Sequence, residues 1–80
     1  MNIWNAIDTL GAGIKDDRLR AAWARLLETR TSDDCEYAAW VADRVPGQTA
    51  EYVAVASRAA DLARAEQRLF EALINAGVKP

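Results

Sequence analysis

Residues 52–76 read YVAVASRAADLARAEQRLFEALINA, and they carry the strongest structural signal in the chain. Positions spaced alternately by three and four residues form one seam: Tyr52, Val55, Ala59, Leu62, Glu66, Leu69, Leu73 and Ala76. All but Glu66 are apolar. This spacing predicts one long helix of about 27 residues, or about 40 Å at 1.5 Å per residue. We expect Thr49 to cap its start, Gly77 to end it in the left-handed conformation, and Val78 to fold back on Leu73.

Working outward from this helix, the preceding residues predict three shorter ones. A stripe of isoleucines and Leu10 indicates a first helix that Asn2 caps and Gly11 ends. Asp16 or Asp17 caps a second helix that runs to about Arg30. Because the two shorter main helices are each about half as long as the last one, we expect them to lie end to end along it.

The third helix is predicted over about Asp33 to Val45. Thr31-Ser32-Asp33-Asp34 marks its start, and Pro46-Gly47 follows its end. No stretch alternates with the period-two pattern of a strand. The chain is therefore predicted to be all-α, a small helical bundle with a short N-terminal helix and three main helices, the last of which is the long C-terminal one. Residues 1–80 form a single helical domain in this prediction.

The composition narrows the possible functions. Of the 80 residues 51% are apolar, but seventeen are alanine, so the larger apolar side chains suffice for one core. The net charge is −2, with no histidine and one cysteine. These counts exclude a disulfide framework, a Cys/His zinc site and histidine-based acid–base catalysis. We therefore predict a protein that is not an enzyme, with no catalytic or metal-ligating residues and no cofactor.

We expect neither an export signal nor a membrane segment in this sequence. Its first uncharged stretch, residues 1–7, ends at Asp8, and no run approaches the 20 or so apolar residues of a transmembrane helix. The cytoplasm is the expected location. Cys35 is expected to be an inert thiol, because the acidic neighbours Asp33, Asp34 and Glu36 oppose thiolate formation.

Tryptophan positions suggest a core residue and a contact surface. Trp23 lies among leucines on its helix and is predicted to be buried. By helical geometry Trp40 flanks the stripe of its own helix, beside Arg44, and Trp4 lies at the edge of the first helix's stripe. Because aromatic residues beside arginine are typical of binding hot spots, the partner-binding candidates are Trp40, Arg44, Tyr37 and Trp4.

The last helix is apolar over a wider arc than one neighbour requires. Residues outside its seam extend the apolar face to about half of its circumference, which suggests burial from two directions. We therefore predict a homodimer formed through this helix. Glu66 is expected at the rim of the seam or paired with an arginine of the same chain, and the alternative is that it sets the register of the dimer. The candidates for self-association are Val53, Ala56, Ala60, Ala63, Glu66 and Ile74.

A protein–protein interaction module is the predicted function. It would be a stand-alone inhibitor or adaptor that occludes a partner protein, like those of phage and mobile elements, anti-CRISPR inhibitors among them. That likeness is one of size and style, and no motif matches a particular family. The alternative is a DNA-binding transcriptional regulator that uses Arg18, Arg20 and Arg25. Nucleic acid is the less favoured partner, because the would-be recognition helix begins with acidic residues. A ligand pocket at the dimer seam is a third, weaker idea.

Overall fold

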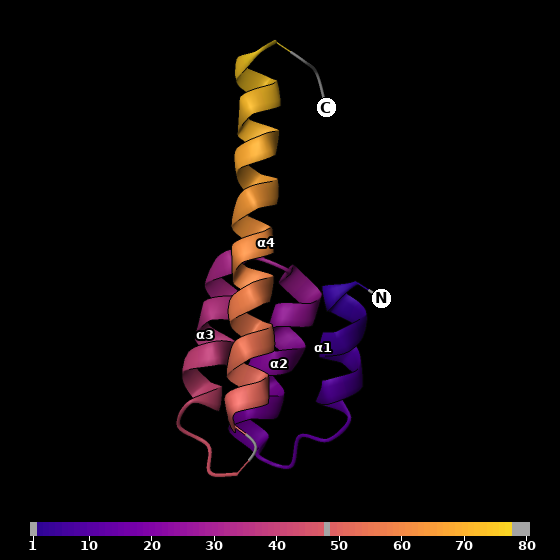
Figure 1. Ribbon diagram of the computed structural model, residues 1–80, viewed down its shortest axis with the longest axis vertical. Coiled ribbons are helices and arrows are strands. Elements are labelled where there is room, and N and C mark those ends of the chain that lie inside the picture. Colours follow the sequence, from indigo (N-terminus) through magenta and orange to yellow (C-terminus); the bar gives the residue numbers. More distant parts are fainter. Residues whose placement is uncertain (1, 48, 78–80) are drawn as a thin grey trace.

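Four helices account for most of the chain (Figure 1). The structure, a computed structural model, describes residues 2–47 and 49–77, and for Thr49 it describes the backbone alone. In chain order the helices are α1 (Ile3–Gly11), α2 (Asp17–Thr29), α3 (Ser32–Ala42) and α4 (Thr49–Asn75). The described residues contain no strand. This confirms the predicted all-α fold with a short first helix and a long last one.

The predicted caps begin the first three helices. Asn2 Oδ1 accepts a hydrogen bond from Asn5 N at 2.9 Å, and Asp16 Oδ1 accepts one from Leu19 N at 2.9 Å. Thr31 Oγ1 accepts one from Asp34 N at 3.2 Å. Each of these oxygens satisfies an N–H group that lacks a partner within its helix.

Two predictions at helix ends have different outcomes. The third helix ends at Ala42, three residues before the predicted Val45, and Val45 N donates instead to the Ala42 carbonyl at 3.2 Å in a tighter turn. The approach to Pro46 explains this end, because a proline disfavours the helical conformation of the residue before it. Gly77 has the predicted left-handed conformation, with φ of +82°. The capping side chain of Thr49 and the contact of Val78 lie outside the described residues.

The helices do not lie as the sequence suggested. α2 and α3 are not placed end to end along α4; they lie side by side and antiparallel (Figure 1). Arg30 causes the reversal, because its left-handed backbone, with φ of 53°, turns the chain sharply between the two helices. α4 therefore packs along α3 and α1 only with its first half, and its second half projects from the bundle. The molecule measures 47 × 22 × 18 Å.

Trp23 lies at the centre of the core, as predicted. Its side chain is 2% exposed, its Nε1 donates to the Ile7 carbonyl at 2.7 Å, and its ring meets Tyr52 edge-on at 5.3 Å. The Tyr52 hydroxyl donates to the Leu10 carbonyl at 3.2 Å. Two aromatic side chains thus fix the end of α1 through their polar atoms while their rings fill the core.

Small residues allow α4 to approach the bundle closely. Four alanines on its first half are buried: Ala56, Ala59, Ala60 and Ala63. At the upper end of this contact Arg64 forms ion pairs with Glu36 of α3 and with Asp61. Every described residue from Ala65 to Gly77 is exposed. Within the described ranges, no helix is both long enough and apolar enough to cross a bilayer.

Candidate protein-binding surface

Tyr37 and Trp40 form an exposed aromatic pair on α3. Their rings are nearly parallel, at an angle of 15° with centroids 6.1 Å apart, and their side chains are 49% and 44% exposed. Arg44 follows one turn after Trp40, and its Cζ lies 3.7 Å from the Trp40 ring centroid. Arg18 of α2 reaches the same ring, with its Cζ at 5.1 Å. We call these four residues, Arg18, Tyr37, Trp40 and Arg44, the Trp40 surface.

The local sequence explains why this pair faces outward. On α3 the buried positions are Cys35, Ala38, Ala39, Val41 and Ala42. Tyr37 and Trp40 are three residues apart and share the remaining face with Arg44. α3 therefore packs against its neighbours mainly through small side chains and leaves its two large aromatic residues to solvent.

Neighbouring arginines restrain the Trp40 ring. Arg44 Nη1 donates to the Trp40 carbonyl at 2.9 Å, which fixes the guanidinium against the ring. Each cation–π contact at an exposed site contributes about 0.5–1 kcal/mol. Neither Arg18 nor Arg44 forms an ion pair with a carboxylate in the part of the chain that the structure describes. Both guanidiniums therefore keep free N–H donors beside an exposed aromatic face.

Trp4 does not join this surface. It is partly buried on α1, and the Arg30 guanidinium lies over its ring at 5.0 Å. Arg18 and Arg30, which contact the two tryptophans, lie at opposite ends of α2, about 18 Å apart along the helix. Of the four predicted partner-binding residues, the structure brings Tyr37, Trp40 and Arg44 together and places Trp4 elsewhere.

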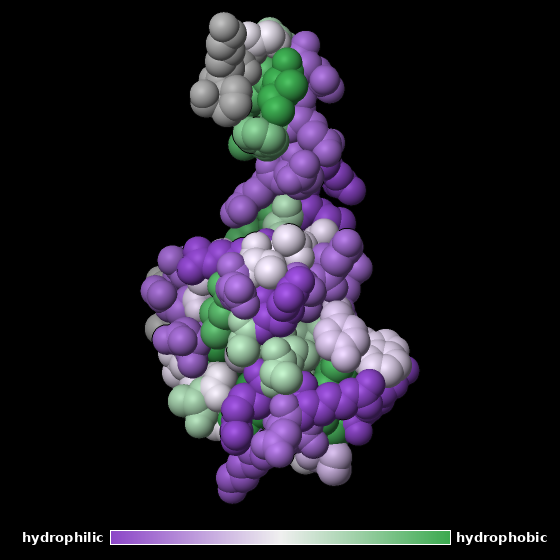
Figure 2. Space-filling view, turned by 180° about the vertical axis from the view of Figure 1, so that it is seen from behind, coloured by the Kyte–Doolittle hydropathy of each residue, from purple (hydrophilic) through white to green (hydrophobic). Residues whose placement is uncertain are grey.

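The residues predicted for self-association separate into two groups. Ala56, Ala60 and Ala63 are buried inside the chain's own core, so this fold does not offer them to a second chain. Val53 is half-buried and packs against the same core. Only Glu66 and Ile74 lie exposed, on the projecting half of α4. Figure 2 shows hydrophobic side chains gathered near the free end of this half and hydrophilic ones below them.

The projecting half of α4 carries a group of exposed apolar side chains, and the sequence did not lead us to predict them as one surface. They are Leu69, Phe70, Leu73 and Ile74, of which Leu69 is the most exposed at 63%. Arg18 was considered only as a DNA-binding residue, and its contact with the Trp40 ring was not predicted. The helix lengths could have indicated that α4 projects from the bundle. Once α2 and α3 lie side by side, with 13 and 11 residues, they cover only about half of the 27 residues of α4.

The remaining arginines near α2 have their own partners. Arg20 pairs with Asp17 at 3.5 Å and donates to the Ile14 carbonyl at 2.9 Å. Arg25 pairs with Asp34 at 3.5 Å, and Arg30 covers Trp4. Phosphate contacts need arginines that share one free surface, and these point to separate partners. The arrangement of these arginines therefore does not favour binding to a DNA duplex.

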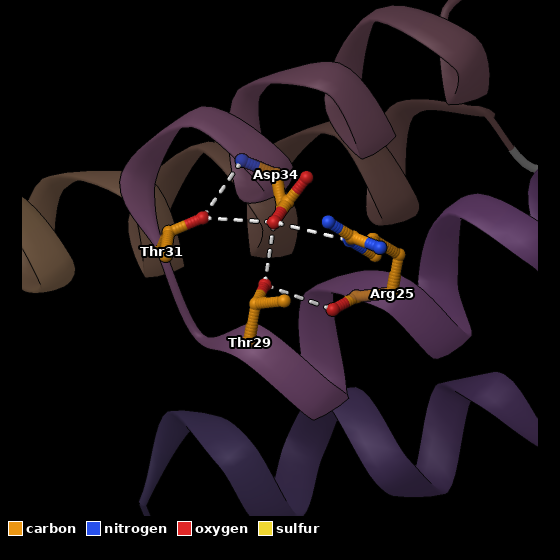
Figure 3. Close-up of polar contacts among 4 residues, drawn as sticks. All are labelled: Arg25, Thr29, Thr31 and Asp34. Atoms are coloured by element: carbon orange, nitrogen blue, oxygen red, sulfur yellow. Dashed lines mark hydrogen bonds and ion pairs between the residues drawn. The ribbon is translucent and has the colours of Figure 1, made fainter.

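Asp34 joins α2 to α3 through a cluster of polar contacts (Figure 3). Its Oδ2 lies 2.6 Å from the Thr29 hydroxyl, 2.9 Å from the Thr31 hydroxyl and 3.5 Å from Arg25 Nε. Hydrogen bonds from Thr29 and Thr31, followed by the charge of Arg25, lower the pKa of the Asp34 carboxyl. This cluster stabilises the corner between the helices, so we assign it a structural role.

Two described features bear on possible chemistry, the cysteine and a cavity. Cys35 is buried, and burial, followed by the charges of Asp34 and Glu36, raises its pKa to about 11. A cavity of about 670 Å³ lies between the α1–α2 and α3–α4 connections, with Lys15, Asp16 and Tyr52 as its titratable lining residues. The Tyr52 hydroxyl there already donates to Leu10. Among residues 2–47 and 49–77, no three potential ligands gather in a group that could hold a metal ion.

Comparison of the chain with protein-family models, curated proteins and solved structures finds no significant match. The residues of this chain alone therefore carry the functional inference.

Proposed function

We propose that the chain is a non-catalytic protein-binding module, an inhibitor or adaptor that occludes a partner protein through the Trp40 surface. The observation that carries this proposal is the exposed Tyr37–Trp40 pair with two guanidiniums on the Trp40 ring. Trp, Tyr and Arg are the residue types that dominate the free energy of binding at protein interfaces. A ring already held by its neighbours loses little conformational entropy on binding.

The arginines of the Trp40 surface indicate what kind of partner surface would complement it. Arg18 and Arg44 have free donors although the chain as a whole carries a net charge of −2. A carboxylate that reaches the rim of the Trp40 ring would accept charge-assisted hydrogen bonds from them. The partner's surface is thus expected to combine an apolar patch with acidic side chains. Association should weaken as salt concentration rises, because exposed charges are screened.

Affinity capture from a lysate of the native host tests this function. Wild-type protein is compared with Trp40→Ala and Arg18→Ala as immobilised bait, and Arg20→Ala is the matched control. Arg20 belongs to the same helix as Arg18 but pairs with Asp17. We expect the first two variants to lose the captured protein and the control to retain it.

Affinities for the captured protein then quantify the effect. Trp40→Ala is expected to weaken binding by about 2 kcal/mol, or about thirtyfold, with unchanged helicity by circular dichroism. Equal capture by wild type and Trp40→Ala would refute the assignment of this surface. Binding to arbitrary DNA duplexes that falls steeply with salt and depends on Arg18 would favour the regulator instead.

A further inference from the structure

The projecting half of α4, residues 65–75, lacks the packing that a stable helix needs. Every described residue from Ala65 onward is exposed, including four large apolar side chains: Leu69, Phe70, Leu73 and Ile74. A helix of about 12 residues is marginal on its own in water, and its stability in proteins comes mostly from burial of an apolar face. This half is therefore suited to pack against a further helix.

One stripe of this half continues into a groove of the bundle. Leu62, Leu69 and Leu73 lie within an arc of about 40° at 100° per residue. Leu62 also lines a groove of about 460 Å³ between α1 and α4, together with Asn2, Ile3, Ala6 and Arg58. The stripe thus runs from the groove to the tip of α4, with Glu66 as the charged residue between Leu62 and Leu69.

We propose that a second copy of this chain covers the stripe, with the two α4 helices antiparallel. Leu62 and Leu73 are 11 residues apart, about 16 Å along the helix. If the two-fold axis crosses α4 between residues 67 and 68, Leu73 of each copy lies beside Leu62 of the other and enters its groove. The same patch is used twice, as an isologous interface requires.

Charge complementarity favours the antiparallel arrangement. Arg58 lines the groove and forms no ion pair with any carboxylate that the structure describes. The last turn of α4 has no basic residue, and a helix C-terminus carries partial negative charge on its free carbonyls. The proposed register places Arg58 of one copy beside residue 77 of the other. A parallel pair would instead place like charges together at both positions.

Glu66 lies at the edge of the stripe, close to the two-fold axis. In this register Glu66 faces Leu69 of the other copy, so the two Glu66 carboxylates are offset by only about 4.5 Å along the axis. The two carboxylates therefore lie at nearly the same level on facing helices, where like charges repel each other. Glu66 therefore weakens the pair, and its replacement by glutamine should tighten association.

Dimerisation leaves the Trp40 surface free. Arg64 is about 160° from Leu62 around α4, and it pairs with Glu36 of α3. The stripe thus faces away from α3, which carries Tyr37 and Trp40. The dimer presents two copies of the Trp40 surface, and a bivalent partner would bind it with increased avidity.

Light scattering behind a sizing column tests the pairing on the full chain. We expect about twice 8.8 kDa at tens of micromolar, and a monomer at every concentration would overturn the proposal. Leu73→Glu should give monomers with unchanged helicity. Asn75→Glu, a change to the same residue type on the opposite face of the helix, should leave the dimer intact. Glu66→Gln should lower the dissociation constant about fivefold.

Cross-linking tests the direction. Chains with Leu62→Cys are mixed with tagged chains with Leu73→Cys and oxidised, while the native Cys35 remains buried. The antiparallel register predicts disulfides between the two kinds of chain. Disulfides within each kind alone would show a parallel pair and overturn the register. Because these measurements need no partner protein, they are independent of the outcome at the Trp40 surface.

Discussion

Replacing Trp23 by alanine should remove the residue that joins three helices. The ring belongs to α2, its Nε1 donates to the Ile7 carbonyl of α1, and its edge meets Tyr52 of α4 at 5.3 Å. It is 2% exposed, so truncation leaves a large cavity. A buried tryptophan replaced by alanine costs about 3–5 kcal/mol. The lost hydrogen bond, about 1 kcal/mol, places the expected loss at the upper end of that range.

This loss is comparable with the whole stability of the domain. A single hydrophobic core in a domain of about this size rarely supplies more than about 3–5 kcal/mol of net stability. This is the low end of the range of about 4–12 kcal/mol that 0.05–0.15 kcal/mol per residue gives for 80 residues. Trp23→Ala should therefore be largely unfolded near 37 °C. Trp23→Phe, which keeps most of the volume but not the N–H group, should lose less and thus separate the two contributions.

Trp40→Ala is the matched comparison, because it removes the same side chain from the surface. The ring is 44% exposed and its contacts are with Tyr37, Arg18 and Arg44. We expect a cost of about 1 kcal/mol from the lost cation–π and aromatic contacts. Most of the helical signal and the cooperativity of unfolding should remain.

Urea denaturation followed by circular dichroism at 222 nm measures both changes, since fluorescence would report on the very residues replaced. Wild type and Trp40→Ala should unfold with the same dependence on urea, which reflects the surface exposed on unfolding. If Trp40→Ala cost as much stability as Trp23→Ala, Trp40 would be a core residue and the Trp40 surface would not be a contact surface.

Three further outcomes are expected. Gly11→Ala should lower stability by about 1–3 kcal/mol despite the better helix propensity of alanine, because the new Cβ lies 3.0 Å from Trp23 Cδ1. Gly13→Ala, whose Cβ meets only ordinary contacts, is its control in thermal melts. Asp34→Asn should lower the melting temperature at pH 7, and its gap to wild type should close below about pH 4. The reason is that the lowered pKa of Asp34 gives stability that is present above the ordinary carboxyl pKa and lost as pH falls through the folded one. Cys35, with its pKa raised to about 11, should resist alkylation by iodoacetamide at pH 8 until urea unfolds the chain, and fast labelling of the native protein would contradict this.

Local chemistry made the helix boundaries predictable. Asn2, Asp16 and Thr31 each accept a backbone N–H bond where their sequence positions predicted a cap. The burial of Trp23 followed from its leucine neighbours, and the exposure of Trp40 from its place beside the apolar stripe. These predictions succeeded because each depends on residues within one or two helical turns.

The arrangement of the helices depends on single backbone angles, which the sequence did not reveal. Arg30 takes the left-handed conformation that is commonest for glycine, so nothing in its residue type indicated the sharp reversal. That reversal places α2 beside α3 and shortens the bundle relative to α4. The contact of Arg18 with Trp40 has the same origin, because it joins two helices whose relative position could not be predicted.

The alanines of α4 show why the sequence could not separate residues for self-association from residues of the core. Alanine fits equally well beneath a closely packed neighbour and on a face that a second chain approaches, so the helical wheel could not tell the two apart. Ala60 lies in the core at 1% exposure. Ala60→Glu would put a charge on a predicted self-association residue, but it would bury an unpaired carboxylate at a cost of several kcal/mol and unfold the chain. A monomer seen with that variant would therefore say nothing about association. Leu73→Glu places the same charge on an exposed residue, so only a loss of pairing can explain its effect.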